Sequence, residues 1–246
     1  MKLAWSAALA LAVLPQLSAA EGAHWGYEGE AGPDAWATLD PANALCATGK
    51  QQSPIDLSGA VQDDLGGLSR VWAADTDWTV LNNGHTIQAA PAHGQPAGQL
   101  TIDGKVYDLV QFHFHHPSEH AVDAARTDLE VHFVHKAQDG ALAVVGVMLT
   151  GGGDKGVLDQ ILAVAPVAEG EVPGGVADPS TLLPADGHYY RYQGSLTTPP
   201  CSESVTWTVM TQPVAVSDEA IGAFGALFAN DARPLQPVND RTLLTN

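Results

Sequence analysis

Short runs of alternating apolar and polar residues recur in the middle of the chain, and an Asp-Gly dipeptide separates two pairs of them. Asp103-Gly104 lies between residues 99–102 and 105–116, and Asp139-Gly140 lies between residues 129–136 and 141–149. Alternation is typical of strands with one buried face, and Asp-Gly between two such runs favours a tight reversal of the chain. The pattern therefore predicts two β-hairpins.

Helical periodicity is confined to short stretches. One covers residues 155–165, and a second opens at Ser217 as a candidate N-cap. One side of this second stretch carries Ile221, Phe224, Leu227 and Phe228. Neither an internal repeat nor a low-complexity linker divides the sequence. We predict a single, mainly β domain built on a large, mostly antiparallel sheet with a few short peripheral helices.

The N-terminus has the pattern of a secretory signal peptide. Lys2 supplies a positive charge, residues 3–14 are mostly apolar, and Ser18-Ala19-Ala20 is a small-residue cleavage site. A membrane anchor is the alternative, but the apolar run ends at Pro15, short of the ~20 residues that span a bilayer. We therefore expect residues 21–246 to form the mature domain, periplasmic or secreted, with no membrane association after the signal is removed.

The composition fits one large globular domain and excludes several other classes of protein. Of 246 residues, 45% are hydrophobic and 15% are charged, whereas about 25% are charged in a typical soluble protein. Disorder, collagen and coiled coil are excluded. The formal net charge of −18 repels phosphate backbones and anionic lipid surfaces. Nucleic acid is therefore not an expected partner.

The sequence contains two cysteines, Cys46 and Cys201. In the oxidising compartment that the N-terminus predicts, two cysteines favour a disulfide. Two buried free thiols are the alternative, and a catalytic thiol is less favoured.

Histidines are concentrated in one segment, since six of the ten lie within 23 residues. They are His113, His115, His116, His120, His132 and His135. Successive side chains of a strand point to opposite faces, so Gln111, His113 and His115 share one face. Phe112 and Phe114 point the other way, into a core. Two imidazoles therefore converge on the polar face.

A second strand supplies a third imidazole. In residues 129–135, Glu130, His132 and Val134 share one face. Three imidazoles from two strands, with no carboxylate or thiol among the ligands, are typical of an open zinc site whose fourth position holds water. An open fourth position is typical of catalytic rather than structural zinc sites. Gln111 and Glu130 lie on the same faces, where they are placed to accept the imidazole N–H groups.

Other interpretations of the histidines remain open. His-x-His also occurs in copper and nickel sites. For His116, His120 and His135, whose parity or position differs, a hydrogen-bonded structural role is favoured over metal binding.

These residues belong to a longer set of motifs that resembles the α-class carbonic anhydrases. The segments that carry the resemblance are His24-Trp-Gly-Tyr27, Gln52-Ser-Pro-Ile-Asp56, Asn82-Asn-Gly-His-Thr-Ile87, Gln111-Phe-His-Phe-His-His-Pro-Ser-Glu-His120, Glu130-Val-His-Phe-Val-His135, Ser195-Leu-Thr-Thr-Pro-Pro200, Val205-Thr-Trp207 and Arg233-Pro-Leu-Gln-Pro237. The resemblance implies a wide, twisted, mostly antiparallel sheet with zinc at the bottom of a cone-shaped cleft. The placement of Cys46 and Cys201 resembles exported bacterial members, in which these two form a disulfide.

The resemblance also implies a role for each residue of the site. One Zn²⁺ per chain would be held by His113, His115 and His132. Gln111 and Glu130 would orient these ligands. Thr197 would accept a hydrogen bond from the attacking oxygen and donate its own proton to the buried carboxylate of Glu119.

The reaction that the resemblance implies is reversible hydration of carbon dioxide to bicarbonate and a proton. The matching substrate pocket consists of Val134, Val144, Leu196, Thr198 and Trp207. His85 matches the family's proton shuttle, a role that suits a side chain with an ordinary pKa of ~6.5. A solvent-exposed histidine beside an Asn-Gly turn is the alternative for His85. Apart from the small-molecule substrate, we expect at most a second copy of the chain as partner, giving a monomer or a homodimer.

Two other functions remain open. A family member that binds zinc without activity could serve in ligand binding or adhesion, although the three histidines, Glu119 and Thr197 disfavour it. An exported zinc esterase would use the same three histidines, and ester turnover exceeding carbon dioxide turnover would reveal it.

Overall fold

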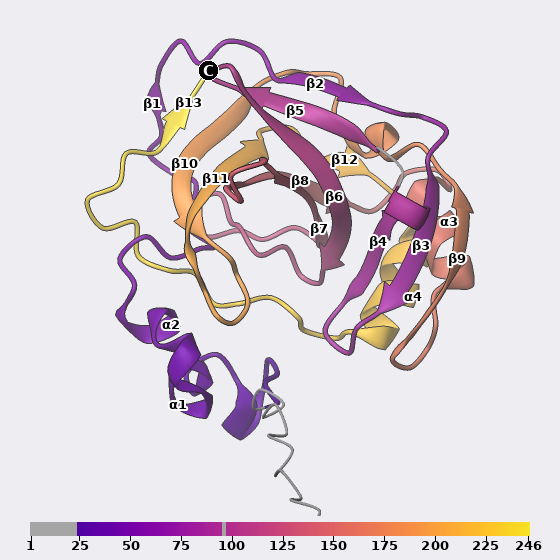
Figure 1. Cartoon of the computed structure of the whole chain (residues 1–246), viewed down its shortest axis with the longest axis horizontal. Coiled ribbons are helices and arrows are strands. Elements are labelled where there is room, and N and C mark those ends of the chain that lie inside the picture. Colours follow the sequence, from indigo (N-terminus) through magenta and orange to yellow (C-terminus); the bar gives the residue numbers. More distant parts are fainter. Residues whose placement is uncertain (1–23, 95–96) are drawn as a thin grey trace, which may run out of the picture.

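The described chain is organised around one twisted sheet of 13 strands (Figure 1). The computed structural model describes residues 24–94 and 97–246, and the predicted signal peptide, residues 1–20, lies outside the described residues. The strands are β1 (Val61–Gln62), β2 (Ser69–Trp72), β3 (Asp77–Asn82), β4 (Ile87–Pro91), β5 (Gly98–Ile102), β6 (Lys105–His115), β7 (Leu129–Lys136), β8 (Leu142–Thr150), β9 (Gly170–Val176), β10 (Tyr189–Ser195), β11 (Glu203–Met210), β12 (Val214–Ala215) and β13 (Leu244–Thr245).

The helices are short. They are α1 (Trp36–Leu39), α2 (Leu45–Thr48), α3 (Val157–Val164) and α4 (Asp218–Leu227), with 3₁₀ turns at Gly29–Ala31, Pro41–Asn43, Ala92–Gly94 and Pro179–Leu182. The prediction of a mainly β fold with a few short helices is confirmed. In the described residues, none of the helices is long and apolar enough to cross a bilayer.

The sheet is mixed rather than purely antiparallel. Its main path runs β1-β13-β10-β11-β8-β7-β6-β4-β3-β9, with β12 paired to β8 and β2 paired to β5, which in turn pairs with β6. Parallel pairing joins β1 to β13 and both β11 and β12 to β8, whereas the other pairings are antiparallel. The strands β6 and β7 therefore lie in the interior of the sheet.

Both predicted hairpins are present, with different turns. The β5–β6 turn has two residues, Asp103 and Gly104, with φ of 50° and 78°. The β7–β8 turn is longer, because Ala137 N donates to Ala141 O at 2.9 Å and closes a wider loop. Within this turn only Gly140, with φ of 87°, has positive φ. The Asp-Gly signal locates both reversals, but the length of the second is set by its backbone hydrogen bonds.

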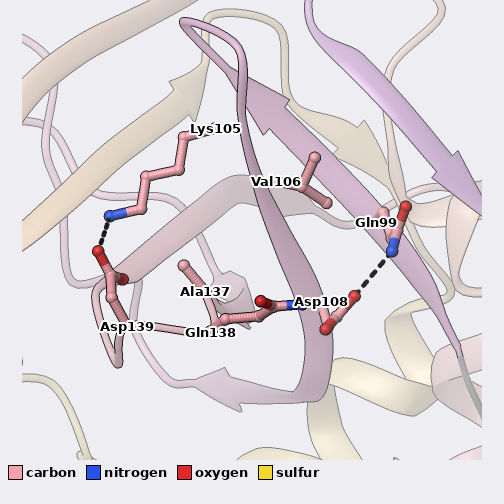
Figure 2. A pocket seen from close by; sticks show the side chains of 7 residues that line it. All are labelled: Gln99, Lys105, Val106, Asp108, Ala137, Gln138 and Asp139. Atoms are coloured by element: carbon pink, nitrogen blue, oxygen red, sulfur yellow. Dashed lines mark hydrogen bonds and ion pairs between the residues drawn. The ribbon is translucent and has the colours of Figure 1, made fainter.

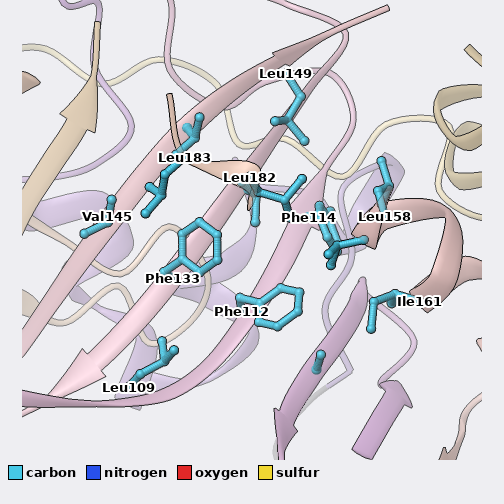
Figure 3. Close-up of a cluster of buried hydrophobic side chains, with 14 of the residues drawn as sticks. Leu109, Phe112, Phe114, Phe133, Val145, Leu149, Leu158, Ile161, Leu182 and Leu183 are labelled. Carbon is cyan, nitrogen blue, oxygen red and sulfur yellow. The ribbon is translucent and has the colours of Figure 1, made fainter. Parts of the chain in front are cut away.

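The apolar core covers one face of the sheet (Figure 3). Phe112, Phe114 and Phe133 are fully buried there, as the strand parity predicts, and α3 packs Leu158 and Ile161 against them. A β-bulge between Leu109 and Gln111 resets the alternation in β6. Leu109 and Phe112 therefore both face the core although they are three residues apart.

The predicted helices α3 and α4 also meet each other. Ser217 is the N-cap of α4, and its hydroxyl accepts a hydrogen bond from Ala220 N at 3.0 Å. The same hydroxyl donates to Asp159 Oδ1, in α3, at 2.6 Å. Phe224 of α4 is fully buried in the core. One side chain thus caps a helix and joins it to its neighbour.

Cys46 and Cys201 form a disulfide that spans 155 positions of the sequence. It joins α2 to the loop that follows β10, four residues beyond Thr197. Gln52 reinforces the connection, since its Nε2 donates to Cys201 O at 3.0 Å. The disulfide therefore attaches the N-terminal segment to the loop that contains Thr197.

Loss of the disulfide is expected to destabilise the protein. Closing a loop with a sequence separation of 155 restricts the unfolded chain by about 5 kcal/mol in the chain-entropy model. We expect Cys46→Ser/Cys201→Ser to lower the free energy of unfolding by about 2 to 5 kcal/mol, measured by denaturant unfolding against the oxidised wild type. Alkylation of two thiols in the native, unreduced protein would contradict the bond.

Candidate metal centre

Three histidines from β6 and β7 converge on the face of the sheet opposite the phenylalanine core. His113 and His132 are directly paired across the two strands, and His115 follows two residues further along β6. The ring centroids are 5.3 Å apart for His113 and His132, 5.0 Å for His113 and His115, and 4.7 Å for His115 and His132. One nitrogen of each ring lies within 4.8 Å of the other two. The structure thus brings together the three predicted ligands.

Hydrogen bonds define which nitrogen of two rings is free. His113 Nδ1 donates to Gln111 Oε1 at 2.8 Å, and His115 Nδ1 donates to Asp231 O at 2.8 Å. Amide and carbonyl oxygens only accept, so the proton is on Nδ1 and the lone pair is on Nε2 in both rings. Gln111 was expected beside His113 and accepts its hydrogen bond, whereas Asp231 was not singled out from the sequence.

The third ring is oriented by a carboxylate. His132 Nε2 lies 2.9 Å from Glu130 Oε1, although its N–H is poorly aligned with that oxygen. Glu130 also accepts from His120, whose Nδ1 and backbone N lie at 2.8 Å or less. Burial favours the neutral acid, but attraction and hydrogen bonds from His120 and His132 hold the pKa of Glu130 well below its usual range. A charged Glu130 leaves His132 Nδ1 as the free nitrogen.

The surroundings keep two of the three rings neutral. Burial, together with the neighbouring His115 and His132, holds the pKa of His113 well below its usual value. Burial also lowers the pKa of His132. For His115, burial favours the neutral ring, but the carboxylates Glu119 and Asp231 raise the pKa above its usual value. The cluster therefore combines two rings whose neutral form is favoured, His113 and His132, with one ring, His115, beside two carboxylates that favour a positive charge.

These donors fit a zinc ion. His115 Nε2 is buried without a hydrogen-bond partner among residues 24–94 and 97–246. Three imidazole lone pairs that face one another, with a carboxylate beside them, suit a divalent cation with one open position. A second group, His120, Glu130 and His132, is equally close but does not fit. Both ring nitrogens of His120 are occupied, by Glu130 and by Tyr192 OH, each at 2.7 Å.

The remaining histidines of the segment are hydrogen-bonded. His116 Nδ1 donates to Ala229 O and His135 Nδ1 donates to Phe133 O, both at 2.9 Å. Their positions agree with the structural role favoured for them.

Glu119 and Thr197 are both buried but are not joined. Glu119 Oε1 accepts from Arg233 N at 2.9 Å, while Oε2 lies 3.6 Å from His115 Nε2. Glu119 Oε2 has no hydrogen-bond partner in the part of the chain that the structure describes, and so none from Thr197. The acceptor that the resemblance assigns to Thr197 is therefore free and turned toward the metal ligands.

Four of the five residues of the predicted substrate pocket form part of a second apolar cluster, on the histidine face. Val144 and Trp207 are buried in it, and Val134 and Leu196 pack against it. Trp207 lies edge-on to His132, with ring centroids 4.8 Å apart, and its Nε1 donates to Ser195 O at 3.0 Å. The half-buried Thr198 accepts from Cys201 N at 2.8 Å.

His85 lies apart from the triad, beside a small cavity. Its ring stacks on Trp25, with centroids 3.7 Å apart and planes at 8°. Both residues line a cavity of about 290 Å³ that also touches Tyr27 and Asp231. One residue of this lining, Asp231, accepts a hydrogen bond from His115 through its backbone carbonyl and so links the cavity wall to the histidine cluster.

Three contributors to the site were missed in the sequence. They are Trp25, Tyr192 and Asp231. Trp25 is part of a segment recognised as a family motif, but nothing in that motif indicates the stacking on His85. Tyr192 and Asp231 lie far along the chain from their partners, and no local spacing signals their contacts.

Another cavity lies at the far end of β6 and contains no histidine (Figure 2). Four of its polar side chains pair with one another: Lys105 with Asp139 at 2.7 Å, and Gln99 with Asp108 at 2.9 Å. The three clustered histidines do not line this cavity.

Comparisons with known proteins agree with one another. The family model described as eukaryotic-type carbonic anhydrase matches residues 31–246. The carbonic anhydrase of Pectobacterium carotovorum is 42% identical over 250 residues, which cover 99% of this chain and 100% of the relative. That of Nostoc sp. is 40% identical over 228 residues, covering 90% and 85%. The solved α-carbonic anhydrase of Thermovibrio ammonificans, in complex with the inhibitor sulfanilamide, is 41% identical with a TM-score of 0.85, covering 91% of this chain and 99% of that one.

The histidine geometry predicts one zinc ion per chain. His115→Ala is expected to weaken zinc binding by more than ~10²-fold, because loss of a direct ligand exceeds the 10 to 100-fold cost of losing an orienting partner. Elemental analysis after dialysis measures the retained zinc. His188→Ala, which removes an exposed histidine, is the matched control. Stoichiometric zinc in His113→Ala/His115→Ala would overturn the assignment.

Proposed function

The chain belongs to the eukaryotic-type, or α-class, carbonic anhydrase family, and we propose on this basis that it catalyses the reversible hydration of carbon dioxide to bicarbonate and a proton. The observation that carries the proposal is the convergence of three imidazole lone pairs beside an apolar cluster. No other function is favoured by a contact in the described residues.

We propose Zn²⁺, one per chain, as the metal. His113 and His115 would bind it through Nε2, and His132 through Nδ1. When bound, zinc supplies a Lewis acid that makes a hydroxide nucleophile available at neutral pH. Gln111, Glu130 and the backbone carbonyl of Asp231 keep the three rings in the required orientation. The hydrogen bonds to Gln111 and Asp231, and the negative charge of Glu130 beside His132 Nε2, would favour the tautomers that leave each ligand nitrogen unprotonated.

Thr197 and Glu119 would orient the attacking oxygen. A Thr197 hydroxyl that donates to Glu119 Oε2 has only its lone pairs left, so it can accept a hydrogen bond from the nucleophile but cannot donate one. The support is that Glu119 Oε2 is buried and free, and that its other oxygen is fixed by Arg233 N. The disulfide at Cys201 restrains the loop that contains Thr197.

The substrate would lie against the apolar cluster. Carbon dioxide is neutral and linear and gains little from charged partners, so a wall of apolar side chains next to the ligands suits it. Val134, Val144, Leu196, Thr198 and Trp207 would form this wall. Trp207 is the best supported, because its ring touches His132.

His85 would carry the proton away from the site. Each hydration cycle releases one proton, and an imidazole is the side chain whose ordinary pKa of ~6.5 allows both its capture and its release near neutral pH. The support is that His85 lines a cavity together with Asp231, whose backbone carbonyl accepts from His115.

We also propose that the protein is exported and acts as a monomer or homodimer. The Cys46–Cys201 disulfide fits an oxidising compartment, and the N-terminal pattern is that of a signal peptide.

Carbon dioxide hydration by the mature chain tests the proposed function directly. We expect stopped-flow assays to show turnover that a zinc chelator abolishes and that added zinc restores. Ester hydrolysis measured in parallel distinguishes the alternatives. Ester turnover above carbon dioxide turnover would favour a zinc esterase, and a zinc-loaded chain without hydration would favour a binding protein.

The proton relay predicts a specific kinetic pattern. His85→Ala is expected to lower the maximal hydration rate in dilute buffer by ~10-fold or more, because a positioned general base is lost. Zinc content and kcat/KM should remain unchanged, and imidazole buffer should restore much of the rate. His188→Ala serves as the control. A wild-type rate for His85→Ala in dilute buffer would exclude His85 as the relay.

A further inference from the structure

The turn that carries His85 is held rigidly between strands β3 and β4. Asn83 Oδ1 accepts from His85 N at 3.0 Å and from Thr86 N at 2.9 Å. Gly84 has φ of +83°, a conformation that favours glycine. The His85 backbone is therefore fixed, and its ring rests on Trp25.

A carboxylate from a distant segment packs against this turn. A Cβ atom added to Gly84 would lie 2.9 Å from Glu169 Oε1, so the Glu169 side chain occupies the space above Gly84. Glu169 is brought there by the sheet, because Gly170, the first residue of β9, pairs with Asn82 at the end of β3 (Figure 1). Asn82 Nδ2 adds a hydrogen bond to Pro166 O at 2.9 Å. The segment before β9 is thus attached to the turn at two points.

Glu169 opposes the other influences on the His85 ring. Burial lowers the pKa of His85, the neighbouring His24 lowers it further, and Glu169 raises it. The titratable groups that line the cavity together with His85 are His24, Tyr27, Glu28 and Asp231, and Glu169 is not one of them. Glu169 packs on the turn itself, against Gly84.

We propose that Glu169 is a positioning residue for the proton relay: its carboxylate, held against Gly84, stabilises the protonated form of His85. The inference rests on the proposed role of His85. A relay must hold a proton between its arrival from the site and its release to buffer. Burial and the neighbouring His24 lower the pKa of His85, and a nearby negative charge offsets part of that lowering.

The inference is tested by NMR titration of the histidine side chains in the zinc-loaded mature protein, with the His85 signal assigned from its loss in His85→Ala. Glu169→Gln is expected to move the His85 titration midpoint to lower pH by ~0.5 pH unit, the size suited to one partly screened carboxylate. Glu171→Gln, which removes an exposed charge two residues away, should leave the midpoint unchanged, and Glu169→Asp should give an intermediate value. An unmoved midpoint in Glu169→Gln overturns the inference.

Kinetics separate this result from failure of the proposed function. In Glu169→Gln, the rise of the maximal hydration rate with pH in dilute buffer should shift to lower pH by the same amount, with kcat/KM unchanged. If His85→Ala turns over at the wild-type rate, the relay is wrong, whatever the titration shows. If His85→Ala is slow but Glu169→Gln has a wild-type pH profile, the relay stands and the role of Glu169 is refuted.

Discussion

The pairing register of β6 with β7 is the constraint on which the rest of the structure depends. His113 lies opposite His132, and in the next positions Phe112 lies opposite Phe133. A slip by one residue would exchange the two faces, which would place the imidazoles in the apolar core and the phenyl rings in the site. Burial of each phenylalanine is worth about 1.5 to 3 kcal/mol. The energy that forms the core therefore also holds the clustered histidines in register.

Charged groups inside the protein are tolerated because each has partners. Glu130 is buried between His120 and His132, and Tyr192 extends this network to Ser53. Arg233 is buried as well, and its guanidinium donates to Gln52, Ser53 and Cys46. An unpaired buried charge would cost several kcal/mol, so packing arrangements that break these contacts are disfavoured. The same residues join the N-terminal segment and the disulfide to the sheet.

The surroundings of the site are assembled from segments that are far apart in the chain. The cavity beside His85 is lined by residues from 24 to 31, from the turn at 84 and 85, and from 228 to 231. The three clustered histidines, Gln111 and Glu130 come from two paired strands, whereas Asp231 and Tyr192 reach the same site from distant parts of the chain. Pairing between strands of high sequence separation creates these contacts, as β3 with β9 does for Glu169.

The sequence by itself determined both hairpins, both longer helices, the alternation of histidine and phenylalanine in β6, and the three imidazoles that share one face. These features follow from local periodicity and turn chemistry, which act over a few residues. The tertiary structure alone decided the bulge at Leu109, the parallel pairing of β11 with β8, and the partners Asp231 and Tyr192. It also placed the buried Glu119 Oε2, which has no hydrogen-bond partner among the described residues, 3.6 Å from His115 Nε2. These features depend on contacts between residues that meet only after the sheet has formed, so no local sequence pattern encodes them.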